Sequence, residues 1–267
     1  MNSDYLTDEE YQTYWFRLEG LRKDISESLG LKARMKILDV GVGWGLFAIE
    51  MAKQLKKGEI VGIDIANDDI INARKLVKEA EVEDIVSIQE MDATELSFPD
   101  NHFDLAISFL GMRDIHMTRG KIGVKKAVEE MIRVVKPKGK IVLCITPLED
   151  MEAEDQRIAV KLEGKIFGAE SLPKKFFFDI FKENNVMLMQ TQVYFTDKKL
   201  TASQAKTELK EGIEIARRIY GKKVPEFREV WDKYGKKIEV FGYGMYSKIV
   251  MVVAQKLDGC ACMCLKS

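Results

Sequence analysis

The sequence predicts an α/β protein built on a doubly wound, mostly parallel sheet of seven strands. Between residues 37 and 146, short apolar runs alternate with helix-length amphipathic segments. This order is typical of parallel strands joined by right-handed crossovers. A glycine-rich turn after the first apolar run and a Lys-Pro-Lys-Gly turn before the fifth support the same assignment, because both interrupt helical or strand patterns where a connection is needed.

Composition and charge favour one elaborated domain. The chain has 267 residues, of which 46% are hydrophobic, enough for a large packed core. We expect a single domain over residues 1–256 and a flexible tail over 257–267. The net charge of −1 gives no global attraction to nucleic acid or to an anionic membrane. Apolar stretches too short for a membrane span, and an acidic N-terminus unlike a signal peptide, predict a cytoplasmic protein.

The first predicted helix precedes the sheet. Thr7 and Glu10 have the spacing of a capping box, in which each side chain bonds a backbone N–H of the other residue's turn. The helix is therefore expected to begin at Thr7 and to run to about Leu29.

Three glycines follow the first strand directly. The apolar run Ile37–Val40 leads into Gly41, Gly43 and Gly45, and a helical pattern begins after them. Bare backbone at this place lets a ligand lie against the main chain near the positive end of a helix. The spacing fits the dinucleotide fingerprint G-x-G-x-x-G/A only when counted from Gly43, so the glycines predict a cofactor cradle without naming the cofactor.

Acidic residues mark the ends of the next strands. The second run, 59–65, delivers Asp64 at a position 19 residues beyond Gly45, as expected for a carboxylate that accepts from ribose hydroxyls. Ile65 beside it is suited to lie against an adenine face. The third run, 86–93, carries Asp92 near its end.

The fourth run, 103–109, carries Ser108 near its end, and Asp39 stands at the end of the first. Ligands of doubly wound sheets lie outside the carboxyl ends of the strands. We therefore expect one crevice lined by four strand-end residues, Asp39, Asp64, Asp92 and Ser108.

The run D-x-G-x-G-x-G from Asp39 to Gly45 resembles the first motif of the class I S-adenosylmethionine (SAM) dependent methyltransferases, and segment 130–143 resembles their helix, Lys-Pro-x-Gly, strand hallmark. The resemblance covers about residues 35–146 and implies a Rossmann-like fold with SAM as cofactor. It places Asp39 and the glycines around the methionine part and Asp64 at the ribose. It also implies that Asp92 accepts from the adenine amino group and that Ala93 offers its backbone N–H to the ring.

Beyond the fifth strand, the patterns predict a helix, a strand, two charged amphipathic helices and a last strand, at 172–181, 186–195, 201–220, 225–237 and 245–254. The resemblance implies that this seventh strand is antiparallel between strands five and six. The charged helices then form an insertion at 200–240, which serves as a cap over the substrate or covers a sheet edge. Residues 1–30 are expected to act as a lid whose aromatics, Tyr11 and Trp15 among them, contact substrate or cofactor, or pack in the core.

The segment after the fourth strand holds the candidate catalytic residues. Phe109–His116 resembles the F-G-x-R-N-type segment of ubiquinone and menaquinone C-methyltransferases, with one inserted residue and Asp114 in place of Asn. The segment after strand five differs from theirs. His116, whose ordinary pKa is about 6.5, is the candidate base, with an exposed loop histidine as the alternative. Asp114 is a second catalytic candidate and Arg113 a candidate substrate contact.

We therefore expect methyl transfer from SAM to a small-molecule acceptor by in-line displacement, with S-adenosylhomocysteine (SAH) as product. An NAD-dependent oxidoreductase and a non-catalytic SAM- or SAH-binding regulatory protein remain alternatives. Nucleic acid is disfavoured as a partner, because the charge is balanced and the segment after strand four lacks an Asn/Asp-Pro-Pro-Tyr/Phe motif. Monomer and homodimer remain open. Three alternating thiols, Cys260, Cys262 and Cys264, either bind a soft metal ion or belong to a frayed tail.

Overall fold

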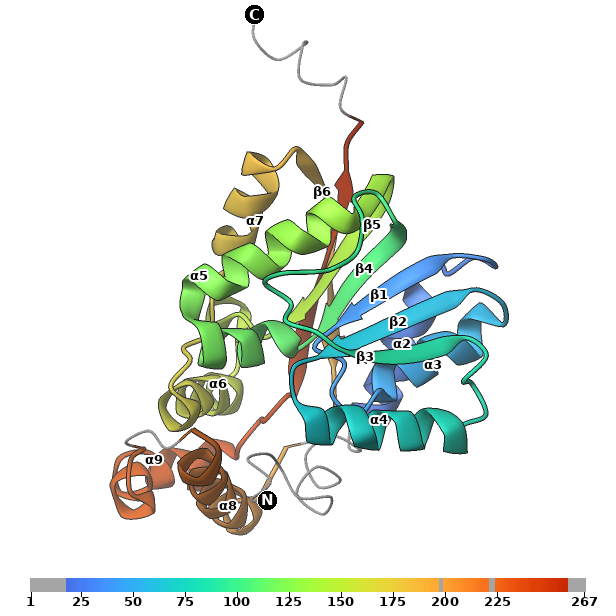
Figure 1. Cartoon of the computed structure of the whole chain (residues 1–267). Coiled ribbons are helices and arrows are strands. Elements are labelled where there is room, and N and C mark those ends of the chain that lie inside the picture. The colour runs from blue at the N-terminus through green and yellow to red at the C-terminus, as the bar shows by residue number, and fades with distance from the viewer. Residues whose placement is uncertain (1–17, 197–198, 221–223, 259–267) are drawn as a thin grey trace, which may run out of the picture. The chain divides into compact units, whose positions relative to one another are not determined.

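The computed structural model describes residues 18–196, 199–220 and 224–258 (Figure 1). These residues form two compact units. The sheet unit comprises Gly20–Ile145, Lys174–Gln192 and the residues from Val250 onward. The helical unit consists chiefly of Thr146–Pro173 and Val193–Ile249. The glycine turn and the strand-end residues predicted to contact the cofactor all belong to the sheet unit.

The sheet has seven strands in the order β3-β2-β1-β4-β5-β7-β6. β1 pairs parallel with β2 and β4, β4 pairs parallel with β5, and β5 pairs antiparallel with β7. The predicted doubly wound sheet with an antiparallel last strand is therefore confirmed. The strands are β1 (Lys36–Val40), β2 (Glu59–Asp64), β3 (Val86–Glu90), β4 (Phe103–Phe109), β5 (Val135–Ile145), β6 (Val186–Phe195) and β7 (Lys248–Lys256).

The chain winds from β1 outward to β3 and then returns to place β4 on the other side of β1. The strand order therefore reverses between β1 and β4, and a ligand crevice is expected outside their carboxyl ends. The central strands β1, β4 and β7 are buried almost continuously along their length, as strands covered on both faces should be. These strands are apolar along most of their length because both faces of the sheet are covered.

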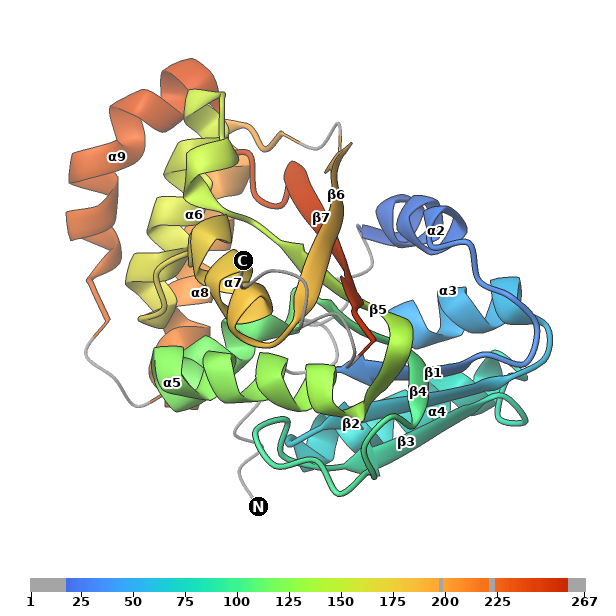
Figure 2. The same cartoon turned by 90° about the horizontal axis from the view of Figure 1, so that it is seen from above.

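Helices cover the two faces of the sheet unit (Figures 1 and 2). On one face lie α2 (Glu19–Ser28), α3 (Leu46–Leu55) and α4 (Asn67–Glu79), and on the other lie α5 (Gly111–Val134) and α7 (Lys174–Glu183). The end of α2 matches the predicted end near Leu29, while the predicted start at Thr7 lies outside the described residues.

In the helical unit, α6 (Glu154–Phe167), α8 (Ala202–Tyr220) and α9 (Phe227–Phe241) pack against one another, and a short 3₁₀ turn, η2 (Leu148–Asp150), precedes them. In chain order α8 and α9 fall between β6 and β7, as the charge pattern predicts. α6 escaped the sequence analysis, although its acidic first turn and Gly168 at its end are helix start and stop signals.

Three local predictions differ from the structure. The segment after β4 was expected to be a loop, but α5 begins there at Gly111 and contains a break at Gly120. The Pro/Gly turn before strand five lies within β5, where Lys138 has a φ of 65°. β3 ends at Glu90, so Asp92 follows the strand instead of ending it.

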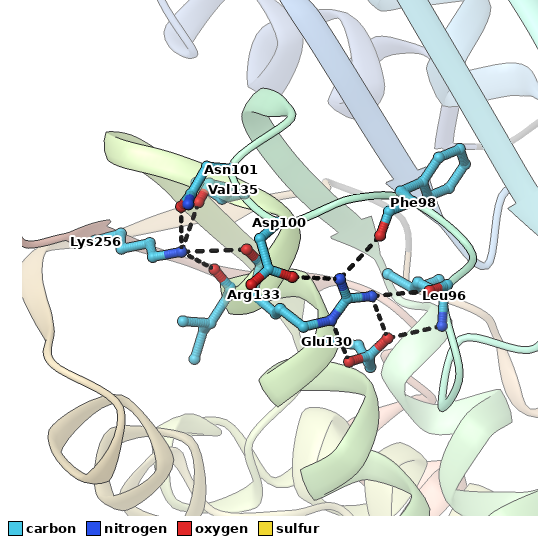
Figure 3. A network of polar contacts seen from close by, with 9 residues as sticks. Leu96, Phe98, Asp100, Asn101, Glu130, Arg133, Val135 and Lys256 are labelled. Atoms are coloured by element: carbon cyan, nitrogen blue, oxygen red, sulfur yellow. Dashed lines mark hydrogen bonds and ion pairs between the residues drawn. The ribbon is translucent and has the colours of Figure 1, made fainter.

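A polar network at the amino ends of β4 and β5 holds the sheet unit together (Figure 3). The guanidinium of Arg133, near the end of α5, donates to both carboxylate oxygens of Glu130 and to Oδ1 of Asp100. It also donates to the carbonyls of Leu96 and Phe98, each at 2.8 Å. One arginine thus connects the helix to the loop between β3 and β4.

Lys256 completes this network from β7. Its ammonium donates to the carbonyls of Ile132 and Val135, each at 2.9 Å or less, and to Oδ1 of Asn101 at 2.9 Å. Carbonyls at the end of a helix have no partner within the helix, and a cation is favourable there. Lys256 therefore stabilises the end of α5.

Replacing Arg133 by alanine is expected to lower the free energy of unfolding by about 2 kcal/mol, because the carbonyls of Leu96 and Phe98 and the carboxylate of Asp100 lose their charged donor. Urea unfolding measures the loss. Lys126→Ala, an exposed cation on the same helix, is the matched control. Equal stability of the two variants would contradict a structural role for the network.

Candidate cofactor site

The glycine turn has the backbone that its sequence predicts. Gly41, Gly43 and Gly45 have φ values of 71°, 50° and 77°, in the region that favours glycine. The turn also passes close to the start of α5: a Cβ on Gly41 would lie 3.1 Å from Cα of Gly111, and a Cβ on Gly111 would lie 2.8 Å from the carbonyl oxygen of Val40. Side chains at either position would push the two segments apart.

Asp64, at the end of β2, holds this turn in place. Its Oδ2 accepts from the N–H of Gly43 at 2.9 Å, and its Oδ1 accepts from the N–H groups of Ile65 and Ala66 at 2.8 and 3.1 Å. Burial raises the pKa of Asp64 although these hydrogen bonds lower it. A carboxylate has roughly four acceptor positions. Three are used, which leaves one for a ribose hydroxyl instead of the expected two.

Asp39 lies in β1, two residues before Gly41, and is almost fully buried. Its Oδ2 has no hydrogen-bond partner among the residues that the structure describes. Burial, and secondly the charge of Asp64, raise the pKa of Asp39 to about 8. A buried carboxyl without a partner is costly, and a positively charged ligand group would relieve that cost. Asp39 is therefore suited to face a cation at the glycine turn.

Trp44 and Asp69 form a second link between the turn and the sheet unit. The indole N–H of Trp44 donates to Oδ1 of Asp69 at 2.9 Å, and both side chains are buried. Burial, followed by the charge of Asp64, raises the pKa of Asp69 to about 8. The hydrogen bond fixes the turn against the first turn of α4.

Asp92 follows β3 and is held by four donors. Its Oδ1 accepts from the backbone N–H and the hydroxyl of Thr94, each at 2.8 Å. Its Oδ2 accepts from Nη2 and Nε of Arg119 at 3.1 and 3.3 Å. Although burial raises the pKa of Asp92, these donors hold it below its ordinary value. Ala93 beside it is half-buried.

The other predicted cofactor contacts divide into two kinds. Ile65 is 43% exposed, which leaves its side chain accessible to an apolar ring. Ser108, in contrast, is fully buried, and its hydroxyl donates to the carbonyl of Val40 at 2.8 Å. Ser108 therefore joins β4 to the end of β1, which is a structural role at the crevice.

The three candidates after β4 lie on the first part of α5. Arg113 and His116 are half-buried, and Asp114 is exposed. Asp114 is close enough to Asp69 for its charge to raise the pKa of that residue. The helix thus brings Asp114 to the site, whereas no described contact assigns His116 a catalytic role.

Several predicted residues lie outside the described ones: Tyr11, Trp15, Cys260, Cys262 and Cys264. Among the residues that the structure does describe, no group of three histidine, cysteine or acidic side chains is arranged to hold a metal ion.

Sequence reasoning missed five residues at the site: Trp44, Asp69, Thr94, Gly111 and Arg119. Thr94 has a local signal, because Asp-x-Thr commonly forms a turn in which the acid accepts from the backbone. The partnership of Trp44 with Asp69 spans 25 residues, and that of Arg119 with Asp92 spans 27, so only the fold reveals them.

Comparison with known proteins indicates which kind of protein this chain resembles. A family model described as a methyltransferase domain matches residues 37–139, which contain the glycine turn, Asp64, Asp92 and the whole of α5. The segment 37–139 thus matches a methyltransferase domain, and the order of the sheet is typical of the class I SAM-dependent methyltransferase fold.

Among individual proteins, the chain is similar to the demethylmenaquinone methyltransferase of Desulfitobacterium hafniense, with 30% identity over 125 residues. That alignment covers 46% of this chain and 47% of the relative, so the chain spans about half the length of the curated relative.

Solved structures share the fold. A putative methyltransferase from Bacillus halodurans has a TM-score of 0.62 and 18% identity, covering 90% of this chain and 99% of that one. A [4+2]-cyclase, SpnF, has a TM-score of 0.63 and 19% identity, covering 90% of this chain and 82% of that one. The shared fold thus also occurs in a protein named for chemistry other than methyl transfer.

The residues of the site fit SAM, the cofactor that the family implies. The orphaned carboxyl oxygen of Asp39 suits the cationic ammonium of the methionine part. The glycine turn gives close access to backbone, the free acceptor position of Asp64 suits a ribose hydroxyl, and exposed Ile65 suits the adenine face.

Proposed function

We propose that this protein transfers the methyl group of SAM to a small-molecule acceptor. The observation that carries the proposal is the buried carboxyl of Asp39, whose Oδ2 has no hydrogen-bond partner among the described residues, two residues before a glycine turn that Asp64 anchors. An NAD-binding site has no evident need for a buried carboxyl at this place, whereas the ammonium of SAM supplies its missing partner.

Bound SAM supplies an electrophilic methyl group on a sulfonium, which passes in line to a nucleophile of the acceptor while SAH is formed. The protein contributes alignment and exclusion of water. Asp39, the glycine turn and Asp64 hold the donor, and Asp92 with Ile65 orients the adenosine. Where the acceptor carries a proton, His116 and Asp114 on α5 are the proposed acceptors of that proton.

For the acceptor we propose a quinone precursor or another small apolar molecule. The support is twofold. The chain resembles quinone C-methyltransferases in the segment 109–116, and the similar protein of Desulfitobacterium hafniense is named for demethylmenaquinone. No helix in the described part of the chain combines the length and the apolar character needed to cross a bilayer.

The proposal is tested with tritium-labelled SAM and a panel of acceptors that includes a demethylated quinone with a short side chain, a thiol, a phenol and a protein extract. We expect label in an organic-soluble product only when a small molecule is added. Asp64→Ala, which removes the anchor of the glycine turn, should strongly reduce that transfer at limiting SAM.

Two outcomes would reject the proposal. NAD binding by titration calorimetry without SAH binding would favour an oxidoreductase. SAH binding without transfer to any acceptor would favour a protein that holds the cofactor and does not turn it over, or one that does other chemistry on this fold.

A further inference from the structure

The carboxylate of Asp92 has no acceptor position to spare. Thr94 supplies two donors to Oδ1 and Arg119 supplies two to Oδ2, at distances between 2.8 and 3.3 Å. Because a carboxylate offers roughly four acceptor positions, all are occupied. An adenine amino group that is to bind Asp92 must therefore replace one of these donors.

Arg119 is the donor that can leave. The contacts of Thr94 lie within a tight turn two residues from Asp92, so losing them would require the backbone to move. Arg119 lies on a different element, and its side chain is 43% exposed, while that of Asp92 is 34% exposed. Ion pairs at such exposed sites contribute little and exchange readily with other partners.

The backbone of α5 is shaped to bring Arg119 to this place. The helix breaks directly after it, at Gly120, where φ is 67° and ψ is −174°. One turn later, a Cβ on Gly123 would lie only 2.1 Å from Cβ of Arg119. Glycine at positions 120 and 123 therefore permits the backbone conformation of α5 that directs Arg119 toward Asp92.

We propose that Arg119 sets the affinity and the base selectivity of the cofactor site by competing with the adenine amino group for Asp92. The inference rests on the proposed function, in which Asp92 receives that amino group. The Arg119 guanidinium holds the carboxylate, and the adenine amino group displaces it from Oδ2 on binding.

The same pair lowers selectivity for the base. With Arg119 present, the site offers N–H donors beside a carboxylate, so a base with an oxygen in place of the amino group still finds a donor. Without Arg119 only the carboxylate remains, and its charge repels that oxygen. Removing Arg119 should therefore raise the preference for adenine in two ways. It frees the Asp92 oxygen that accepts from the amino group, and it removes the donor that a 6-oxo base would use.

The test is calorimetric titration of the full chain with SAH and with S-inosylhomocysteine, its 6-oxo analogue. We expect Arg119→Ala to bind SAH about threefold to fivefold more tightly than the unaltered protein, as release of an exposed ion pair allows. The same variant should bind the 6-oxo analogue more weakly. Arg119→Lys keeps the charge but not the two-pronged contact. Its affinity for SAH should lie between that of the unaltered protein and that of Arg119→Ala.

Controls separate this competition from general effects. Lys126→Ala removes an exposed cation of the same helix and should leave both affinities unchanged. At about 1 M KCl, where exposed charges are screened within roughly 3 Å, the difference in SAH affinity between Arg119→Ala and the unaltered protein should disappear.

The proposal is overturned if Arg119→Ala binds SAH with equal or lower affinity, or if the preference for SAH over the 6-oxo analogue does not rise. Lack of SAH binding by the unaltered protein would instead reject the proposed function. Circular dichroism of each variant confirms that the fold is retained, and Arg119→Lys provides the comparison should Arg119→Ala fail to fold.

Discussion

Replacing Asp64 by alanine is expected to weaken SAH binding by roughly 10- to 100-fold, the cost of losing hydrogen bonds to a charged acceptor. The side chain does two things at once. It accepts from the N–H of Gly43 and so fixes the glycine turn, and it keeps one acceptor position for the ligand. The substitution removes both, and titration calorimetry with SAH measures the loss.

Asp64→Asn distinguishes these two contributions. An amide keeps the shape of the side chain, but it has only one acceptor oxygen and places an N–H₂ group against either Gly43 or the Ile65 and Ala66 pair. We expect binding nearly as weak as that of Asp64→Ala, because the turn loses its anchor. Near-normal affinity in Asp64→Asn would show that the anchor is dispensable.

Asp84→Ala is the matched control for both variants. It removes the same residue type from an exposed position just before β3, at the opposite end of the sheet from the crevice. SAH binding should remain unchanged. If Asp84→Ala weakened binding as much as Asp64→Ala, the effect would reflect the loss of negative charge and would contradict a local role for Asp64.

The sheet was predictable because its signals are local and periodic. Apolar runs such as 103–109 come from burial on both faces, and the predicted limits of that strand match β4. The three glycines have the positive φ values that their spacing suggests, because glycine adopts that backbone without a steric penalty.

The segment after β4 was not predictable in the same way. A short run containing Gly111 and Gly120 has poor helix propensity, and a loop was the natural expectation. Tertiary packing stabilises a helix here despite the low propensity. Met112 and Met117 are buried, so their contacts hold the segment as a helix. This helix moves Asp114, His116 and Arg119 from an expected loop to fixed positions on α5.

The roles of Asp64 and Asp92 were predictable only in part. Their positions after neighbouring strands predict that they share an edge of the sheet, and they do. How many acceptor positions each keeps depends on partners distant in the sequence, namely Gly43 for Asp64 and Arg119 for Asp92. That count decides which ligand group each can take.

SAH affinity is expected to rise with pH, by at most about tenfold per pH unit, between about pH 6 and 8. Burial, and next the charge of Asp64, raise the pKa of Asp39 to about 8 in the empty site, so the carboxyl holds a proton at neutral pH. Facing the ammonium of the ligand requires the ionised form. Binding therefore releases a proton, and affinity increases as pH approaches the pKa of the free site.

Asp39→Asn should remove this pH dependence and bind SAH more weakly at about pH 8, because an amide carries no charge for the ammonium. Comparing binding heats in buffers of different ionisation enthalpy counts the released proton directly. A pH dependence that persists in Asp39→Asn would contradict the assignment.

Asp69→Asn is the decisive control, because the pKa of Asp69 is also raised to about 8 by burial and by Asp64. The amide oxygen can still accept from the indole N–H of Trp44, so the turn stays anchored. If Asp39 is the group that titrates on binding, the SAH affinity of Asp69→Asn still rises with pH, whereas that of Asp39→Asn does not. The reverse result would place the proton on Asp69.

Stability of the empty protein tests the same carboxyl without any ligand. A pKa raised above the unfolded value of 3.8 means that the neutral form favours folding, so the contribution of Asp39 is fully present below about pH 4 and is lost as pH rises toward 8. The melting temperature of Asp39→Asn should therefore overtake that of the unaltered protein as pH increases through this window. Parallel melting curves would show that the buried carboxyl costs nothing when ionised, and that its missing partner is already supplied within the chain.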